Sequence, residues 1–464
     1  MRLQLRRRLA ARLTRFARDE DGVMIAVVIT FMLIMLIVGG VGVDIMRQEM
    51  VRARVQTTLD RAVLAAADLE QELDPEAVVR DYFVKAGIGE YLTNVTVDQG
   101  EGHRIVSATA NGTISTQFLS TIGFNAFTVS AFGQAEESLG DAEISLVLDI
   151  SGSMRTNGKI GNLQTAAEEF IDTVILDDTL GAVSINLIPY TAQVNAGAEI
   201  MNRLNVPRKH NYSSCVLFES ADFNSTAIDP ATEYEQAEHF ELYGAVDSDI
   251  TNPGCPMRSY EEITAYSEDK DALKDQIGDL THRSNTSIHL GMKWAVGMLD
   301  PSFRPVISDM IDNGLVDEVF EGRPTDWDVG ALKTVILMTD GENVNTYGLT
   351  EQAYGTPSMR AHWAKNAVID WLDDNDVPSS DYDEYYFTRS TWRQSDTQLQ
   401  TICDAAKDAG VLVWSVGFEV GDHGASVMRN CASSAAHFFR VEGVEISEAF
   451  RSIARQLNKL KLTH

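Results

Sequence analysis

The sequence predicts a mixed α/β fold whose main domain is a Rossmann-like, doubly wound and mostly parallel sheet. Apolar runs with the composition of buried strands occupy residues 146–148, 183–188, 333–338 and 411–418. Helical patterns lie between them, with apolar residues at three- and four-residue steps from 160 to 174 and a further helical segment at 397–409. Strands that alternate with helices indicate a parallel sheet covered on both faces.

Polar motifs follow two of these strands. Asp149 ends the first run and precedes Ser151 and Ser153, which point to the same side of an extended turn. Asp340 follows the run at 333–338, and ligands of such sheets bind at the carboxyl ends of strands. A carboxylate and two hydroxyls aimed at one point suit a hard cation such as Mg²⁺. The alternative is a structural turn in which Asp149 caps the next helix.

Together the motifs resemble a von Willebrand factor A (vWA) domain with a metal-ion-dependent adhesion site. The resemblance rests on DISGS at 149–153 and MTDGE at 338–342, within a domain that we place at 141–464. It implies that Ser151 and Ser153 bind Mg²⁺ or Mn²⁺ directly. It also implies that Asp149 and Asp340 act mostly through water.

The middle motif of that family corresponds to residues 284–295. Alignment of the helix in this segment implies a third hydroxyl ligand at Thr286. The family's glycines before that threonine are missing, so Ser284 and Ser287 are alternatives, and Thr286 could instead be a helix N-cap. His289 stands next to this loop and could face the site, but we expect it on the surface of the helix.

The resemblance further implies a protein partner. Mg²⁺ takes six oxygens, and an ion held by neutral hydroxyls keeps most of its positive charge. We therefore expect an open position that accepts an Asp or Glu from a partner protein.

The N-terminus predicts a membrane anchor. Residues 1–18 contain seven arginines and no acidic residue, and residues 23–43 carry no charge. A run of this length can cross a hydrocarbon core of about 30 Å, and the arginines place the tail (1–22) in the cytoplasm. A cleaved signal peptide is the alternative, although the run is long for one.

The residues that follow predict an amphipathic helix at 44–72. Apolar side chains step along one face of it: Val51, Val55, Leu59, Val63 and Ala66. Residues 16–22 and 56–67 resemble the N-terminal segment of bacterial TadG-like Flp/Tad pilus-assembly proteins. This resemblance implies a pilin-like stem, pilus-assembly or pseudopilin partners, and an inner-membrane protein with a periplasmic or surface-exposed main domain. An ordinary solvated helix is the alternative. Val27 stands where pilin-type signals have a glutamate after Gly22, so we expect the arginine tail to be retained.

Residues 73–140 predict a small α+β domain. Asp74 is the expected N-cap of a helix at 75–86, and strands are expected at 91–97, 104–110, 112–119 and 127–134. This domain shows no catalytic motif, so a spacer or assembly role is expected.

All four cysteines follow the apolar span. Their spacing excludes CxxC metal or redox motifs, and an oxidising periplasm favours disulfides. Pairing within local segments predicts Cys215–Cys255 and Cys403–Cys431, with four free thiols as the alternative. The first pair falls in an expected insertion at 195–266, and a second, acidic insertion is expected at 347–396.

Composition limits the function. Setting aside the seven tail arginines takes the net charge from −30 to about −37, which disfavours nucleic acid as a partner. No hydrolase or nucleotide-binding motif occurs. We expect a non-enzymatic protein that assembles, anchors or adheres in a Tad/Flp-type pilus system. An envelope adhesin or sensor unrelated to pili and a metal-dependent hydrolase are the alternatives.

Overall fold

The computed structural model describes residues 23–68, 71, 73–100, 103–138, 141–176, 180–327 and 331–461. The chain forms two compact units, Met1–Ser138 and Leu139–His464, which are described separately. The arginine tail and Gly22 lie outside the described residues, so their predicted location and retention stay predictions.

The first unit packs one long helix against a three-stranded antiparallel sheet. Helix α2 (Val23–Ala67) is continuous, and the strands follow the order β1 (Leu92–Gly100), β2 (His103–Ser115), β3 (Ala126–Ser138). Helix α3 (Pro75–Lys85) begins at Asp74, whose carboxylate accepts a hydrogen bond from the Ala77 amide, as predicted. Short helical turns η1 (Gly89–Tyr91) and η2 (Leu119–Ile122) complete the unit.

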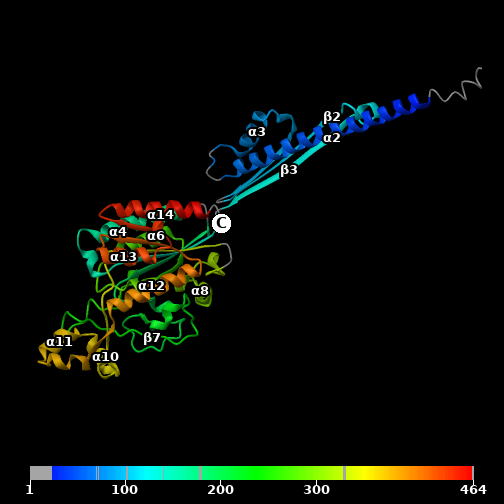
Figure 1. Ribbon diagram of the computed structural model, residues 1–464. Helices are drawn as coiled ribbons and strands as arrows, with labels where there is room; N and C mark the ends of the chain where they lie inside the picture. Colours follow the sequence, from blue (N-terminus) through cyan, green and yellow to red (C-terminus); the bar gives the residue numbers. More distant parts are fainter. Residues whose placement is uncertain are drawn as a thin grey trace, which may run out of the picture. The chain divides into compact units, whose positions relative to one another are not determined.

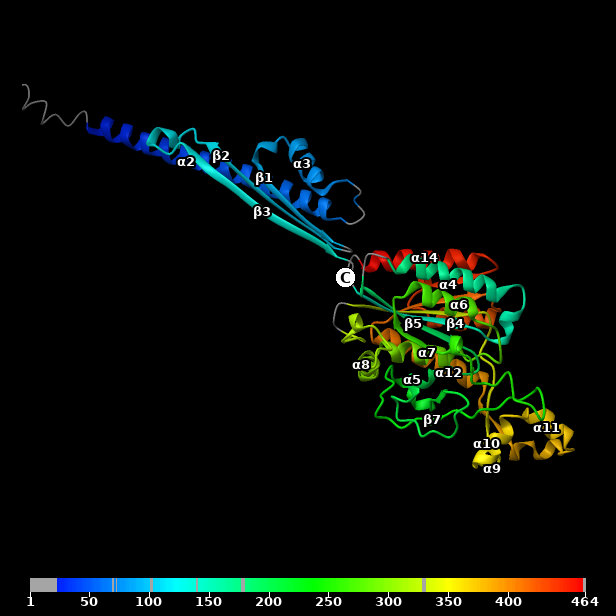
Figure 2. The ribbon, with the colours of Figure 1, turned by 180° about the vertical axis from the view of Figure 1, so that it is seen from behind.

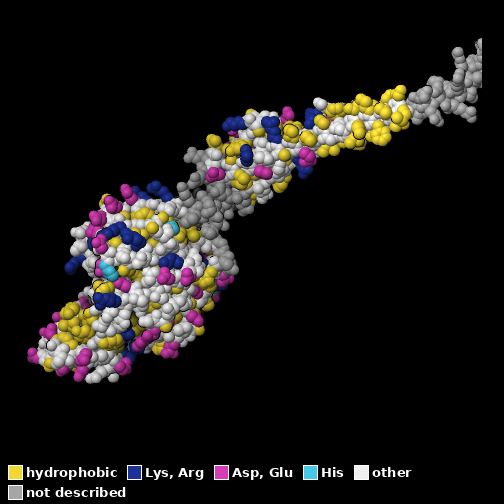
Figure 3. All heavy atoms as spheres, in the orientation of Figure 1, with side chains coloured by type: hydrophobic (Ala, Val, Ile, Leu, Met, Phe, Trp, Pro, Cys, Tyr) yellow, Lys and Arg dark blue, Asp and Glu magenta, His cyan; other side chains and the backbone are white. Residues whose placement is uncertain are grey.

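The two halves of α2 have different surroundings. Its C-terminal half is the centre of the small core, where Val55, Leu59 and Val63 pack with Phe83 and Val106. The alternative of a solvated stem helix is therefore wrong. The N-terminal half instead exposes hydrophobic side chains along its length (Figure 3). By length and composition the helix can cross a membrane.

The sheet of this unit has three strands instead of the four expected. The segments 104–110 and 112–119 were expected to be separate, but β2 runs through Gly112. A Cβ at this position would lie 2.5 Å from Cδ1 of Tyr91, so the glycine admits a ring against the strand. A strand glycine often marks a close approach of this kind, and its sequence signal resembles that of a turn.

The second unit is a doubly wound α/β domain (Figures 1 and 2). Its six strands follow the order β13-β12-β9-β4-β5-β8, and all pairs are parallel except β5 with β8. The central strands β4, β5 and β9 are buried along their whole length, which explains their continuous apolar sequence. The strands are β4 (Ala142–Asp149), β5 (Val183–Tyr190), β8 (Thr264–Ser267), β9 (Leu332–Thr339), β12 (Leu412–Phe418) and β13 (Phe438–Val441).

Helices cover both faces of this sheet, and a separate hydrophobic core lies between each face and its helices. One face carries α4 (Lys159–Val174), α6 (Lys270–Asp279) and α14 (Glu445–Lys461). The other carries α7 (Ile288–Leu299), α8 (Arg304–Asp312), α12 (Trp392–Asp408) and α13 (Asp422–Cys431). Short turns η3 (Gly152–Arg155), η6 (Pro301–Phe303), η7 (Glu318–Phe320) and η9 (Ala435–His437) join these elements.

Two excursions from the sheet lie where insertions were expected, but both are shorter than 195–266 and 347–396, because β8 of the sheet begins at Thr264 and α12 begins at Trp392. The first contains α5 (Gly197–Met201), η4 (Ser220–Asn224), η5 (Ser259–Glu261) and the pair β6 (Val216–Leu217) and β7 (Glu235–Gln236). The second is closed by β10 (Thr346–Leu349) and β11 (Tyr386–Ser390) around α9 (Glu351–Tyr354), α10 (Pro357–Trp363), α11 (Val368–Asp374) and η8 (Ser379–Glu384). Disulfides join Cys215 to Cys255 and Cys403 to Cys431, the pairing that the sequence predicts.

Candidate metal centre

Three loops meet at the carboxyl edge of the second unit's sheet. The first follows β4, the second precedes α7, and the third follows β9. Backbone hydrogen bonds join them: the Gly152 amide donates to the Ser284 carbonyl at 3.0 Å, and the Val344 amide donates to the Thr286 carbonyl at 3.1 Å. A Cβ on Gly152 would lie 2.9 Å from the Ser284 oxygen, so a glycine is required for this contact.

The hydroxyls of the first loop form a chain with the carboxylate of the third. Oγ of Ser151 lies 2.9 Å from Oγ of Ser153, which donates to Oδ1 of Asp340 at 2.5 Å. A Cβ on Gly341 would lie 3.5 Å from Oγ of Ser153 and 3.8 Å from Oγ1 of Thr286. The two hydroxyls thus flank the same bare backbone position, and the structure brings one oxygen-bearing side chain from each loop together.

Asp149 is buried and holds the loops in place. Its carboxylate accepts hydrogen bonds from the Thr339 hydroxyl at 2.7 Å and the Ser151 amide at 2.8 Å, with the Tyr190 hydroxyl at 3.3 Å. Burial raises the pKa of Asp149 to about 6, and the nearby Asp340 carboxylate adds to the shift. Two buried carboxylates this close favour a cation between or beside them.

A lysine supplies positive charge at this site, and the sequence analysis did not predict it. Lys159 opens α4, and its Nζ lies 2.9 Å from Oδ2 of Asp340 and 3.8 Å from Oε2 of Glu419. Its side chain is almost fully buried. A signal was present in the sequence, because Lys159 lies on the same helical face as Leu163, Ala166 and Phe170, where a charge needs a partner.

The donor set fits a hard divalent cation. The side chains that could act as ligands here offer oxygens, from Ser151, Ser153, Thr286, Asp149 and Asp340, and Mg²⁺ prefers oxygen ligands. The Lys159 ammonium has no lone pair to offer an ion, and it occupies one oxygen of Asp340. The bare position at Gly341 leaves space between two of the hydroxyls. Among the described residues, no group of three His, Cys, Asp or Glu could hold a metal, so any ion here depends on hydroxyl ligands.

The alternatives for the third hydroxyl occupy different places. Ser284 has a left-handed backbone (φ 54°), and its side chain lines a neighbouring cavity. Ser287 is the residue before α7, and its buried Oγ has no hydrogen-bond partner within the described part of the chain. Thr286 is the residue whose hydroxyl lies beside Gly341, opposite Ser153.

The expectation of a surface position for His289 is wrong. The ring is buried, and its Nδ1 lies 3.2 Å from Oδ1 of Asn343, which also accepts a hydrogen bond from the Ile288 amide at 2.8 Å. Burial lowers the pKa of His289 to about 4. Every residue of α7 is buried because the first insertion covers the outer side of the helix, with Phe223 against His289. Asn343 thereby fastens the third loop to the start of α7.

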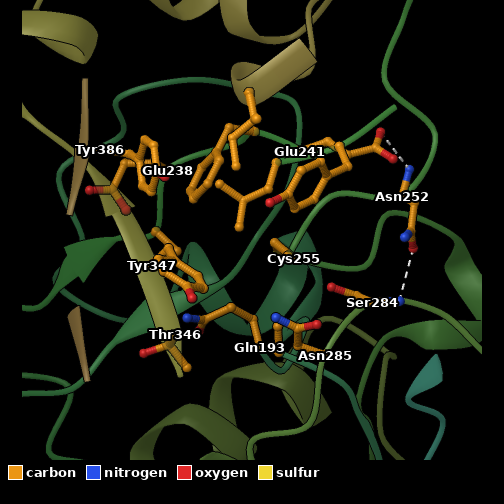
Figure 4. A pocket seen from close by; sticks show the side chains of 17 residues that line it. Gln193, Glu238, Glu241, Asn252, Cys255, Ser284, Asn285, Thr346, Tyr347 and Tyr386 are labelled. Atoms are coloured by element: carbon orange, nitrogen blue, oxygen red, sulfur yellow. Dashed lines mark hydrogen bonds between the residues drawn. The ribbon is translucent and has the colours of Figure 1, made fainter. Parts of the chain in front are cut away.

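A cavity of about 330 Å³ opens next to these loops (Figure 4). Both insertions and the middle loop form its wall, and the Ser284 amide donates to Oδ1 of Asn252 at 2.9 Å. Its lining includes two carboxylates, Glu238 and Glu241, and three tyrosines, Tyr243, Tyr347 and Tyr386. Figure 4 labels both carboxylates and the last two tyrosines. Burial raises the pKa of Glu238, and the Arg389 guanidinium opposes that shift. The cavity is therefore acidic and partly aromatic.

Strand order and motifs define the class of the second unit. Counted along the chain from β4, the strands of the sheet lie in the order 3-2-1-4-5-6, and oxygen-bearing side chains follow the first and fourth of them, β4 and β9. This is the arrangement of a vWA-type fold. The N-terminal segment has a similarity of its own: residues 22–69 match the model of Flp pilus-assembly TadE/G-like proteins. No curated protein matches the chain.

Solved structures of similar architecture are distant in sequence. The vWF domain of the type V pili tip protein Mfa5 from Porphyromonas gingivalis is 13% identical, with a TM-score of 0.36, over 69% of this chain and 96% of that one. The PilB minor pilin from Streptococcus sanguinis is 12% identical, with a TM-score of 0.33, over 79% and 78%. Proximal thread matrix protein 1 from the mussel byssus, with a zinc-occupied MIDAS motif, is 13% identical, with a TM-score of 0.28, over 69% and 46%. The vWA class assigned above rests on this chain's own topology and motifs.

Proposed function

We propose that this chain is a membrane-anchored protein of a Tad/Flp-type pilus system that binds a partner protein through a metal ion at the vWA site. The single observation that carries the proposal is the convergence of Ser151, Ser153 and Asp340 at the sheet edge, with Thr286 alongside. The TadE/G-like match at residues 22–69 supports the pilus assignment. The apolar half of α2 supports the anchor. The seven arginines of residues 1–18 support a cytoplasmic tail and hence a vWA domain on the periplasmic side.

The residues of the site would have two different roles toward the ion. Ser151, Ser153 and Thr286 would contact the ion, whereas Asp149 and Asp340 would hold its water ligands. Mg²⁺ or Mn²⁺ supplies a positive charge that can take a carboxylate from outside. Asp149 is already engaged by Thr339 and Ser151, which fits a positioning role. The Lys159 ammonium neutralises part of the carboxylate charge when no ion is bound.

The neighbouring cavity would receive a second side chain of the same partner. Ser284 and Asn285 line it and directly precede Thr286, so the cavity and the ion share one loop. Glu241 would favour a cation, although it also accepts the Thr251 and Asn252 amides, whereas Glu238 is already paired with Arg389. The faces of Tyr347 and Tyr386 would attract a cation as well. We therefore expect a partner with a basic residue near the acidic residue that reaches the ion. Such a partner also suits the acidic composition of the chain.

Crosslinking capture from the native envelope tests this function. The full-length protein should capture the same partner repeatedly with Mg²⁺, lose it with EDTA and regain it when Mg²⁺ returns. Asp340→Asn should abolish capture. Asp300→Asn is the matched control, because Asp300 is also buried and caps a turn at the other end of α7. Capture that survives EDTA and Asp340→Asn would refute a metal-dependent interaction.

A further inference from the structure

The sheet-facing stripe of α2 extends into the apolar span. It includes Val55 and Val51 in the small core, then Asp44, and then Gly40, which is buried. Gly40 belongs to the uncharged run at 23–43. Part of the folded domain therefore lies beside the segment that the proposed function places in the membrane.

The part in question is the connection between β2 and β3, residues 116–125, called here the hairpin tip. A Cβ on Gly40 would lie 2.6 Å from Cγ of Phe118, so the phenylalanine rests directly on the helix backbone. Oδ1 of Asp44 accepts the Gln117 amide at 3.0 Å, and Oδ2 accepts the amides of Phe118 and Leu119, both at 2.9 Å. Three hydrogen bonds and a ring contact thus fix the tip to the end of the span.

The depth of this contact follows from helix geometry. A helix rises 1.5 Å per residue, so Gly40 lies about 25 Å from Val23, inside a hydrocarbon core of about 30 Å. Asp44, the first charged residue after the span, then lies at the far boundary of that core. Its carboxylate is only 3% exposed and is occupied by the tip amides, which suits a position with little water.

The exposed side chains of the hairpin tip are apolar, as expected for a segment at the boundary of the hydrocarbon core. Phe118, Ile122 and Phe124 are 47%, 52% and 66% exposed, although each is a large apolar side chain. No Asp, Glu, Lys or Arg occurs from residue 105 to residue 135, while such residues make up 23% of the chain. A soluble surface rarely lacks charge over such a length, and exposed apolar clusters mark interaction sites.

We propose that the hairpin tip is a second membrane contact, with Phe118, Ile122 and Phe124 inserted into the outer boundary of the lipid layer that α2 crosses. The occupant is lipid because the tip continues the apolar surface of the span and lies at the depth where α2 leaves the hydrocarbon core. Phe side chains are among those that membrane-surface segments bury at the boundary between headgroups and acyl chains. The contact would fix the depth of α2 and the orientation of the first unit on the membrane, and it rests on α2 crossing the bilayer.

Depth-dependent fluorescence quenching tests the inference. The full-length protein is reconstituted in vesicles of phosphatidylethanolamine and phosphatidylglycerol that contain nitroxide-labelled lipid. The four native cysteines are paired, so a fluorophore reacts with one introduced thiol at a time. Phe124→Cys reports the tip, Leu33→Cys reports the span, and Lys85→Cys on α3 is the exposed control. Near Lys85, α3 contacts α2 through the Arg54 side chain, which donates to the Ala86 carbonyl well beyond the span.

We expect nitroxide near the top of the acyl chains to quench the Phe124→Cys label several-fold more than the Lys85→Cys label. Quenching at Leu33→Cys but only background quenching at Phe124→Cys would overturn the membrane contact while leaving the anchor intact. No quenching at Leu33→Cys would refute the anchor itself. An unquenched Phe124→Cys that forms disulfides between copies would assign the tip to a second copy of the chain and also overturn the proposal.

Discussion

Each unit buries a carboxylate, Asp44 in the first and Asp340 in the second, and the partners of the two carboxylates differ. The comparison distinguishes a carboxylate that stabilises the fold from one that belongs to a binding site. In the first unit, Asp44 accepts three backbone amides and fixes a turn. In the second unit, Asp340 faces side-chain groups, with the Ser153 hydroxyl on one oxygen and the Lys159 ammonium on the other. Backbone amides cannot leave a carboxylate, whereas a hydroxyl can turn and an ammonium can move away. A carboxylate surrounded by movable groups can exchange its partners for an ion.

Reduction of the disulfides should produce the largest difference between the units. All four cysteines lie in the second unit, and each link is expected to stabilise it by about 2–4 kcal/mol. Dithiothreitol should therefore lower the unfolding temperature of the second unit and leave that of the first unchanged. Hydrogen exchange followed peptide by peptide during heating reports the unfolding of each unit separately. A loss of protection in α3 of the first unit equal to that in the second unit would mean that the two units unfold together.

Removal of the Asp44 carboxylate should chiefly affect the first unit. Asp44→Ala leaves three amides without their charged acceptor, so we expect the first unit to lose stability, with faster exchange at residues 117–119. Asp60→Ala is the matched control, because Asp60 lies on the exposed side of the same helix. If both substitutions destabilise equally, the amides at the tip do not depend on Asp44.

Acid should weaken the second unit through its buried histidine. Burial lowers the pKa of His289 to about 4, below the ordinary value of 6.5. As pH falls from 6.5 to 4, the unfolded chain takes up a proton at His289 that the folded chain excludes, so this residue removes roughly 2–3 kcal/mol of stability over the window. Asp149, whose pKa is raised to about 6, takes up a proton in the folded chain over the same range and opposes this loss, so a His289 variant is needed to isolate the histidine. His289→Asn should flatten the dependence of unfolding free energy on pH in this range. An unchanged slope would show that the ring is not held neutral.

Removal of the Lys159 ammonium should give opposite effects without and with metal. Lys159→Met leaves the carboxylates of Asp340 and Asp149 without a counter-charge, so the metal-free protein should become less stable. Mg²⁺ would no longer compete with the ammonium, and its Kd should fall roughly tenfold. Calorimetric titration measures the affinity. A Kd that rises would mean that Lys159 helps to hold the ion instead of replacing it.

The sequence predicted the features that depend on local pattern. Buried parallel strands are continuous apolar runs, so β4, β5, β9 and β12 were predicted to within a few residues. The polar motifs after β4 and β9 could then be placed at the carboxyl edge of the sheet. The disulfides were also found, because each pair lies within one segment. These features need no knowledge of distant contacts.

Features that depend on distant contacts were missed. Lys159 and Asp44 resemble ordinary charges in sequence, and only the fold shows that each lies on a buried helical face. His289 was misplaced because periodicity cannot show that an insertion covers a helix. Gly112 was taken for the gap between two strands because an internal strand glycine and a turn glycine give the same signal. In both buried-charge cases, a charged residue on an apolar stripe was the available clue.

Metal-dependent stabilisation of matched serine variants tests the central claim most directly. Ser151 and Ser145 are both buried near the same strand, but Ser145 donates to the Ala295 carbonyl, away from the site. Mg²⁺ at 100 times its Kd should stabilise the wild-type second unit by about 2.7 kcal/mol. Ser145→Ala should keep this increment, and Ser151→Ala should lose most of it. Equal stabilisation of both variants, or none in the wild type, would contradict a metal site built on Ser151, Ser153 and Asp340.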